Sequence, residues 1–288
     1  MRIVKVIGGL GNQMFQFALY KALQKRFPEE QVLLDLHCFN GYHKHSGFEI
    51  GRIFHAEYKT ASLIDITKLA YPYPNFQSWR IGSRILPKRK TILKEKRDLS
   101  IEIDLFRNRD NTYYDGYWQH DYYFANIRGL ILATFSFPAF ECKRDCDIAL
   151  QAINCNSVAI HVRRGDYIKD KLFKDISTID YYRAAIKEIY SRVSPDIFYI
   201  FSNDITWCKQ LEDYISSPIV YVDWHTGTDS YRDMQLMSLC KHHIIANSSF
   251  SWWGAWLHEG KGQIVICPRK WMNIDNLCSP AQESWIKI

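Results

Sequence analysis

From residue 157 to residue 267 the sequence alternates short apolar runs with amphipathic segments, and no other feature constrains the fold as strongly. The apolar runs are rich in β-branched residues and predict strands, while the amphipathic segments have helical periodicity. Strands are expected at 157–162, 197–202, 219–222, 243–246 and 263–267. Helices are expected at 180–190, 206–215, 231–241 and 249–259, the first capped by Ser177 or Thr178. Strands separated by helices form a parallel sheet covered on both faces, so this part predicts a Rossmann-like unit.

The first forty residues begin in the same way. Residues 2–7 predict a buried strand, 8–11 a glycine loop, and an apolar stripe from Phe15 to Leu23 predicts a helix that ends before Pro28. Residues 31–36 predict a second buried strand. Between about 40 and 141 the chain is rich in Tyr and Pro turns, and few elements can be assigned. We therefore expect two Rossmann-like domains, 1–150 and 151–288.

The composition is that of a globular protein. The 288 residues are 47% hydrophobic and 24% charged, which is enough apolar material for two cores. No apolar run approaches the roughly 18 residues of a membrane span, and the first residues lack a signal-peptide pattern, so we expect a cytoplasmic protein. The eight cysteines include no CxxC pair and are expected to be reduced and buried. Repeated aromatic and basic motifs are absent, so nucleic acid is not expected as a partner.

The densest run of positive charge lies between Arg80 and Arg97, in a chain of formal net charge +6. Such a run is often the solvated face of a helix or loop. The alternative is a patch that contacts acidic headgroups at the inner face of a membrane, as in a peripheral protein, or a polyanionic acceptor. The overall charge also suits an acidic ligand such as a nucleotide phosphate.

Ligands of open parallel sheets bind at the carboxyl ends of the strands. That rule points to the loops 8–13, 163–167, 203–204 and 247–251. The strongest signal is the segment HVRRGDY from His161, in which a buried strand runs directly into Arg163 and Arg164. A guanidinium there suits a phosphate, because its planar fork donates two parallel hydrogen bonds. The alternative is an Arg–Asp pair that only stabilises the strand end.

Within this segment Gly165 lets the chain turn away, and Asp166 is placed to hold one arginine by a salt bridge. Arg164 is the expected partner of Asp166, because successive residues of an extended strand point to opposite sides and Arg163 would then face the phosphate.

Other loops carry groups that suit an anionic ligand. Gly9 and Gly11 would let a ligand approach backbone N–H groups at a helix start. Ser248, Ser249 and Ser251 lie at the start of another helix, where they can cap the helix, bind an anion or do both. Asp233 also begins a helix, where it complements the helix dipole or accepts hydrogen bonds from a guanine base.

Two other classes of function remain open at this point. Asp35 ends the second strand, as in an NAD-linked oxidoreductase, but Met14 stands where the GxGxxG pattern needs its third glycine. A non-catalytic glycan-binding module would use the aromatic residues, which make up 15% of the chain. No metal site is expected, because the DxD at Asp145 and Asp147 does not follow a buried strand.

Four segments resemble the bacterial α-1,2-fucosyltransferases of glycosyltransferase family 11. They are GGLGNQMFQ from Gly8, GYWQ followed by YF from Gly116, HVRRGDY from His161, and DMQLMSLCKHHIIANSSFSWWGAWL from Asp233. The resemblance implies an α/β fold of GT-B type with two parallel sheets, and it implies GDP-β-L-fucose as donor substrate. It also implies inversion at the anomeric carbon, no metal or other cofactor, and a galactose-terminated oligosaccharide or lipid-linked glycan as acceptor, as in O-antigen synthesis.

The same resemblance implies roles for individual residues. Arg163 would contact the β-phosphate, His161 and Asp233 would contact guanine, and Asn12 would face the reacting sugar. Asp204 follows a strand where relatives often carry acids, which makes it a further donor-site candidate. The candidate catalytic residues are Arg163, Asn12 and Asp166. The candidate donor-binding residues are His161, Arg163, Asp233, Ser248, Ser249, Ser251, Asp204, Gly9 and Gly11.

Overall fold

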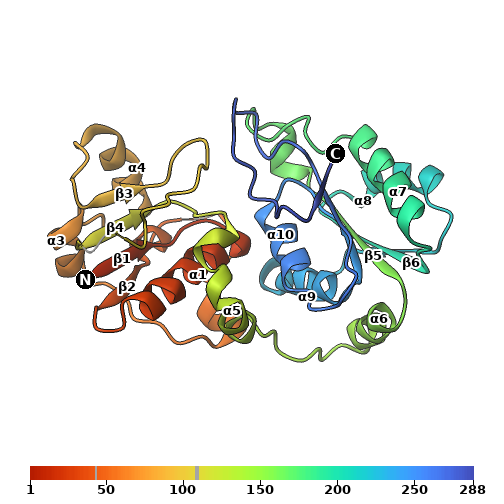
Figure 1. Cartoon of the computed structure of the whole chain (residues 1–288), viewed down its shortest axis with the longest axis horizontal. Coiled ribbons are helices and arrows are strands. Elements are labelled where there is room, and N and C mark those ends of the chain that lie inside the picture. The colour runs from red at the N-terminus through yellow and green to blue at the C-terminus, as the bar shows by residue number, and fades with distance from the viewer. Residues whose placement is uncertain (43, 108–109) are drawn as a thin grey trace. The chain divides into compact units, whose positions relative to one another are not determined.

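The computed structural model describes residues 1–42, 44–107 and 110–288. The chain divides into two compact units, Met1–Pro138 and Ala139–Ile288 (Figure 1). The division therefore falls after Pro138 rather than after residue 150. The reason is α6 (Lys143–Asn154), whose buried face packs with Ala159 and Tyr199 of the second unit's sheet.

The first unit is built on a parallel sheet of four strands in the order β2-β1-β4-β3. Tyr113 packs in one cluster with Ile66 and Leu69, which come from the unit's third helix. The strands are β1 (Arg2–Lys5), β2 (Val32–Asp35), β3 (Ile92–Lys94) and β4 (Thr112–Asp115). The helices are α1 (Leu10–Arg26), α2 (Ile50–Phe54), α3 (Leu63–Leu69), α4 (Phe76–Ile85) and α5 (Arg128–Thr134).

The second unit contains a parallel sheet of six strands in the order β10-β9-β8-β5-β6-β7. Its strands are β5 (Ser157–Val162), β6 (Ile197–Ser202), β7 (Ile219–Val222), β8 (His242–Ile244), β9 (Val265–Cys267) and β10 (Ile286–Lys287). Its remaining helices are α7 (Ile179–Arg192), α8 (Ile205–Cys208), α9 (Tyr231–Leu239) and α10 (Ser249–Trp256).

Side chains of β5 alternate between two cores. Val158, Ile160 and Val162 pack with residues of α7, whereas Ala159 packs with residues of α6 and α9. Both faces of the sheet are thus covered by helices, as Figure 1 shows. The prediction of an α/β protein with two Rossmann-like units and parallel sheets is confirmed.

Several local predictions need correction. The segment 206–215 is not one α-helix but α8 followed by a 3₁₀ helix at Lys209–Tyr214. The cysteines are all unpaired, yet Cys142 and Cys146 are exposed rather than buried, because they lie at the start of α6 on its solvent side. Within the described ranges, no helix combines the length and apolar character that crossing a membrane requires.

Candidate functional site

The loop after β5 separates its two arginines. Arg163 donates from Nε and Nη2 to Oδ1 of Asp166, over 3.0 and 2.9 Å. Arg164 donates from Nε to Oδ2 of Asp204 over 3.2 Å, and its guanidinium lies 4.5 Å above the Trp207 ring. The prediction that Arg164 pairs with Asp166 is therefore wrong. The chain leaves the extended conformation at Arg164 and enters a 3₁₀ helix at Gly165–Ile168, which returns Asp166 to the side of Arg163.

Gly165 allows the loops after β5 and β6 to meet. A Cβ at this position would overlap the side-chain amide of Asn203. The carbonyl oxygen of that amide accepts a hydrogen bond from the backbone N–H of Arg164 over 3.2 Å. Asp204 has both carboxylate oxygens engaged, one by Arg164 and one by the Trp207 backbone N–H that it caps at 3.1 Å. Asp204 thus holds Arg164 in place and is already satisfied within the protein.

His161 is buried near the end of β5. Burial, together with the nearby charge of Arg163, lowers the pKa of its imidazole to about 3, so the ring is neutral at pH 7. Tyr182 donates its hydroxyl hydrogen to the backbone carbonyl of His161 over 2.9 Å. The imidazole lies beside the Phe250 ring, and its Nδ1 has no hydrogen-bond partner among the described residues. A buried nitrogen without a partner is rare, which makes this atom a candidate for a hydrogen bond with a ligand.

The serine loop that begins α10 contacts the same segment. Ser248 is the N-cap, and its Oγ accepts the backbone N–H of Phe250 over 3.3 Å. Tyr167, which ends the HVRRGDY segment, shares a hydrogen bond with Ser248, and burial raises the pKa of its hydroxyl. Ser251 is fully buried and donates to the carbonyl of Ser248, whereas Ser249 is half-buried in the first helical turn. Ser248 and Ser251 therefore shape the loop, and Ser249 is the most accessible of the three.

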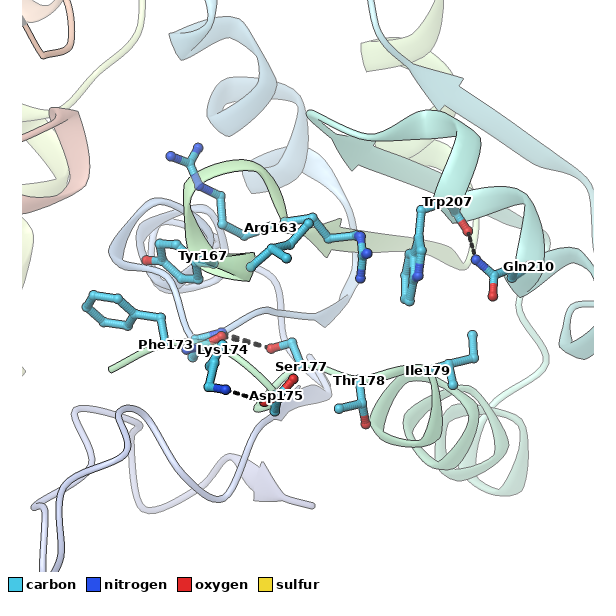
Figure 2. A pocket seen from close by; sticks show the side chains of 13 residues that line it. Arg163, Tyr167, Phe173, Lys174, Asp175, Ser177, Thr178, Ile179, Trp207 and Gln210 are labelled. Atoms are coloured by element: carbon cyan, nitrogen blue, oxygen red, sulfur yellow. Dashed lines mark hydrogen bonds and ion pairs between the residues drawn. The ribbon is translucent and has the colours of Figure 1, made fainter. Parts of the chain in front are cut away.

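A pocket of about 230 Å³ opens beside these loops in the second unit. In Figure 2, Tyr167 and Phe173 lie on one side of it and Trp207 and Gln210 on the other. The Tyr167 and Phe173 rings are stacked with centroids 4.6 Å apart. The lining residues are Arg163, Arg164, Tyr167, Ile168, Phe173, Lys174, Asp175, Ser177, Thr178, Ile179, Trp207, Gln210 and Asn247. The walls thus combine guanidinium groups, hydroxyls and aromatic rings, a mixture that suits a phosphorylated or polyhydroxylated ligand.

Sequence reasoning missed most of this lining. Thr178 was expected only as a helix cap, and it does cap α7 by accepting the backbone N–H of Tyr181. Ser177 donates to the side chain of Asn247 over 2.9 Å and so links the segment before α7 to the serine loop. Phe173 and Trp207 carry no signal of their own in the sequence, because their role depends on which strand ends become neighbours in the sheet.

Asp233 belongs to a largely buried cluster with His225 and Asp145. Its Oδ1 lies 2.7 Å from Nδ1 of His225, and the other ring nitrogen of His225 lies 3.1 Å from Oδ2 of Asp145. Trp224 donates its indole N–H to Asp145 over 2.9 Å, and the Arg144 guanidinium stacks on the Trp224 ring. Burial opposes the charge of His225, but its hydrogen bonds to Asp233 and Asp145 raise its pKa overall. Burial likewise raises the pKa of Asp233, against the effect of His225.

This arrangement also accounts for the DxD at Asp145. Asp145 is buried against His225, whereas Asp147 is exposed and pairs with Lys143 one helical turn away over 2.9 Å. The two carboxylates therefore lie on different sides of α6 and are engaged separately. No group of three or more His, Cys, Asp or Glu side chains in the described ranges is placed to hold a metal ion.

In the first unit, the segment from Gly8 meets the segment from Gly116. Gln119 donates from Nε2 to Oδ1 of Asn12 over 2.7 Å, and the buried Gln16 donates to the carbonyl of Gly116 over 2.9 Å. Gly8 has φ +100°, and a Cβ there would lie 2.9 Å from the Asn12 amide. The glycine is thus required both by the backbone and by the space that Asn12 fills.

Gly9 and Gly11 have different environments. Gly9 is the N-cap of α1, and a Cβ on it would lie 3.1 Å from the His45 ring. Gly11 is buried inside the first turn of α1, because the helix begins at Leu10. The expected glycine loop is therefore shorter than predicted, and Gly11 belongs to the helix rather than to the loop.

The structure thus gathers His161, Arg163 and Asp166 with Ser248 and Ser251 at the carboxyl ends of β5 and β8. Asp204 follows β6 and reaches the site through Arg164, and Asp233 lies with His225 at the start of α9. Asn12, Gly9 and Gly11 belong to the first unit.

Comparison with known proteins identifies the family to which this chain belongs. The profile described as glycosyl transferase family 11 matches residues 88–288. The chain is 32% identical to an alpha-1,2-colitosyltransferase of Escherichia coli over 295 aligned residues, which cover 99% of this chain and 98% of that protein. It is also 32% identical to the O-antigen biosynthesis glycosyltransferase WbnK of Escherichia coli, with 98% of each chain covered. Galactoside alpha-(1,2)-fucosyltransferase 2 of Pongo pygmaeus is 31% identical over 106 residues, or 36% of this chain and 31% of that protein.

Solved structures agree with the fold. The fucosyltransferase NodZ from Bradyrhizobium has a TM-score of 0.52 and 15% identity, with 88% of this chain and 90% of that chain covered. A variant of Arabidopsis thaliana FUT1 in complex with GDP has a TM-score of 0.50 and 12% identity, with 96% and 72% covered. The predicted GT-B fold is thereby confirmed. Because the family profile matches well over half of the chain and two relatives match almost its whole length, the protein belongs to glycosyltransferase family 11.

Proposed function

We propose that this glycosyltransferase moves L-fucose from GDP-β-L-fucose to the 2-hydroxyl of a terminal β-galactoside, with inversion, in the synthesis of an O-antigen or another surface glycan. The reaction type is supported by the family, and the glycan class by the E. coli relative named for O-antigen biosynthesis. The donor is supported by the four sequence segments shared with α-1,2-fucosyltransferases. The proposed site of reaction is the cytoplasm, where GDP-sugars are made.

The main observation behind this proposal is the position and the hydrogen bonding of the Arg163 guanidinium. Its guanidinium stands at the carboxyl end of β5, one third exposed, with two of its N–H groups fixed by Asp166. A guanidinium held in this way has further N–H donors free for a diphosphate and loses little freedom when one binds. Such a group stabilises the negative charge that builds on a leaving GDP.

The neutral His161 and the carboxylate of Asp233 suit a guanine base. The unpartnered Nδ1 of His161 can exchange a hydrogen bond with a base edge. Asp233 has Oδ1 held by His225, and a carboxylate held in this way would suit the N1–H and N2–H donors that guanine presents and adenine lacks as a pair. We therefore assign donor-base recognition to His161 and Asp233, with His225 and Asp145 as their support.

In the proposed step, the acceptor oxygen bonds to C1 of fucose while the C1–O bond to the diphosphate breaks, and GDP leaves with the bonding electron pair. Arg163 meets the charge on the β-phosphate, so no metal ion is required for this purpose. Asp166 holds Arg163 through Oδ1 and is assigned a positioning role rather than that of general base. The acceptor proton then passes to solvent late in the step.

Colitosyl transfer is a second candidate, because a colitosyltransferase is 32% identical over almost the whole chain. Colitose is L-fucose without the 3-hydroxyl. A site that hydrogen-bonds this hydroxyl would reject GDP-colitose by about 10⁴-fold, whereas an apolar site would discriminate only weakly. The ratio of the rates with the two donors therefore shows whether the site hydrogen-bonds the 3-hydroxyl of the sugar.

The test is to incubate the protein with lactose and either GDP-fucose or GDP-colitose, to measure GDP release, and to determine the product linkage by NMR. We expect kcat/KM to favour GDP-fucose and the new bond to lie at O2 of galactose. Transfer from GDP-colitose alone would replace the proposed donor, and fucose on O3 of glucose would refute the proposed linkage. No GDP release with either donor, despite a folded protein, would refute the proposal as a whole.

A further inference from the structure

Helix α4 in the first unit turns apolar side chains toward solvent. Ile81 is 58% exposed and Ile85 is 73% exposed, and their spacing of four places them on one face of the helix. Leu86, the next residue, is 42% exposed. On the opposite face, the Lys5 ammonium lies 4.3 Å from the centroid of the Trp79 ring, and Gly82, about a quarter turn from the isoleucines, is buried against the ring of Tyr73. The helix is therefore fixed to the unit by one side and presents isoleucines on the other.

The helix is held firmly in this orientation. Asn75 caps its N-terminus in a reciprocal arrangement, accepting the backbone N–H of Ser78 over 2.9 Å. After its C-terminus, Arg89 donates to the backbone carbonyls of Thr67 and Ala70 over 2.7 and 2.9 Å. The exposed apolar face is thus not the result of a loosely attached segment.

Cations line one side of this apolar face and continue into the loop after the helix, without acidic partners. Residues 76–94 contain no Asp or Glu, and their Lys and Arg residues are Arg80, Arg84, Lys88, Arg89, Lys90 and Lys94. Apart from Arg89, whose guanidinium fixes the loop, these side chains are exposed and form no ion pair within the described ranges. Arg80 and Arg84 adjoin the isoleucines on the helix, and Lys88 and Lys90 follow in the loop.

This combination distinguishes between two anionic partners. A soluble polyanion would neutralise the lysines and arginines but would leave Ile81, Ile85 and Leu86 in water. An anionic bilayer accounts for both the exposed apolar residues and the cations. Its acyl chains can surround the apolar side chains, while its phosphate headgroups contact the lysines and arginines. If this face were simply exposed to solvent, the charged residues would be explained but the exposed isoleucines and leucine would not.

We propose that α4 and the loop 86–90 dock the enzyme on an anionic phospholipid surface. Ile81, Ile85 and Leu86 enter the headgroup and acyl boundary, while Arg80, Arg84 and Lys88 contact lipid phosphates. The enzyme would then bind a lipid-linked acceptor at the same membrane surface on which it is docked. This last consequence rests on the proposed function, whereas the docking itself does not.

The test is sedimentation of the full chain with vesicles of phosphatidylcholine alone or with 30% phosphatidylglycerol. We expect binding only to the anionic vesicles, weakening as salt is raised. Each surface cation contributes about 1 kcal/mol, so a variant carrying Arg80→Gln, Arg84→Gln and Lys88→Gln should bind roughly 100-fold more weakly. Ile81→Ser with Ile85→Ser should weaken binding roughly tenfold or more.

The matched control is Leu150→Ser with Ile153→Ser on α6, which removes an equally exposed apolar pair, 66% and 61%, from the second unit. This variant should bind vesicles like the wild type. All variants should keep the wild-type melting temperature and the wild-type rate on soluble lactose, because none touches the donor site. Absence of vesicle binding would overturn the proposal, and so would dextran sulfate binding as tight as vesicle binding with no effect of the isoleucine variant.

Discussion

Replacing Arg163 by lysine keeps a positive charge at the end of β5 but removes the planar fork. In the structure, Nε–H and one N–H of Nη2 are directed at Asp166, which leaves three of the five guanidinium donors for a ligand. A lysine ammonium carries its donors on a single atom and cannot contact Asp166 and two phosphate oxygens in the same way. The substitution therefore tests whether the fork, rather than the charge, acts in the reaction.

The expected magnitude follows from those contacts. Losing two charge-assisted hydrogen bonds at about 1.5–3 kcal/mol each corresponds to a fall in kcat of roughly 10² to 10⁴-fold, centred near 10³. The fall should appear in kcat more than in donor affinity, because the phosphate gains negative charge only as the C1–O bond breaks.

The assay is GDP release from GDP-fucose with lactose, together with GDP affinity by calorimetry and melting temperature. Arg164→Lys is the matched control, since Arg164 is held by Asp204 and lies over Trp207. Although Arg164 also lines the pocket, Asp204 and Trp207 already engage its guanidinium, so this substitution should lower the melting temperature and change kcat by less than about tenfold. If Arg163→Lys folds normally and turns over near the wild-type rate, the role proposed for Arg163 is incorrect.

Three further outcomes are expected. Burial lowers the pKa of His161 and of His243 to about 3, so both stay neutral in the folded protein while the unfolded chain protonates them below about 6.5. The stability that each of these two histidines contributes is therefore fully present above about pH 6.5 and is lost below it by about 1.4 kcal/mol per pH unit, against the opposite effect of His225, whose pKa is raised. Unfolding free energies that do not fall between pH 7 and 5 would contradict this. Asp233→Asn should weaken GDP binding about ten- to a hundredfold in calorimetry, and unchanged affinity would leave Asp233 only as a partner of His225. Activity should survive excess EDTA, because Asp145 and Asp147 are engaged separately by His225 and Lys143; loss restored by Mg²⁺ or Mn²⁺ would refute this.

Periodicity predicted the second unit well but not the middle of the first. Strands β5, β6 and β7 occur at the predicted residues, because each is a continuous apolar run between helices with clear amphipathic spacing. Between residues 40 and 141 the helices α2 to α5 have at most ten residues and the strands β3 and β4 at most four. Elements of that length complete too few turns or alternations for a pattern to be seen.

The site shows the same division. That Arg163 and Arg164 end a buried strand could be predicted, because the strand and the loop are adjacent in sequence. Which arginine pairs with Asp166 could not, because the prediction assumed an extended chain through Arg164, whereas φ −121° and ψ −72° there turn the chain into a 3₁₀ helix. The correct pairing therefore depended on one backbone conformation.

The sequence by itself determined the alternation of strands and helices, the loops at the carboxyl ends and the residue types offered there, since these depend on local spacing and chemistry. Only the tertiary structure decided which of those groups meet. His225, which contacts Asp233, reaches Asp145 across 80 residues, and Arg164 reaches Asp204 across 40. Such pairs form because strands that are distant in sequence become neighbours in the sheet, where β5 lies between β8 and β6, and no local pattern in the chain encodes that order.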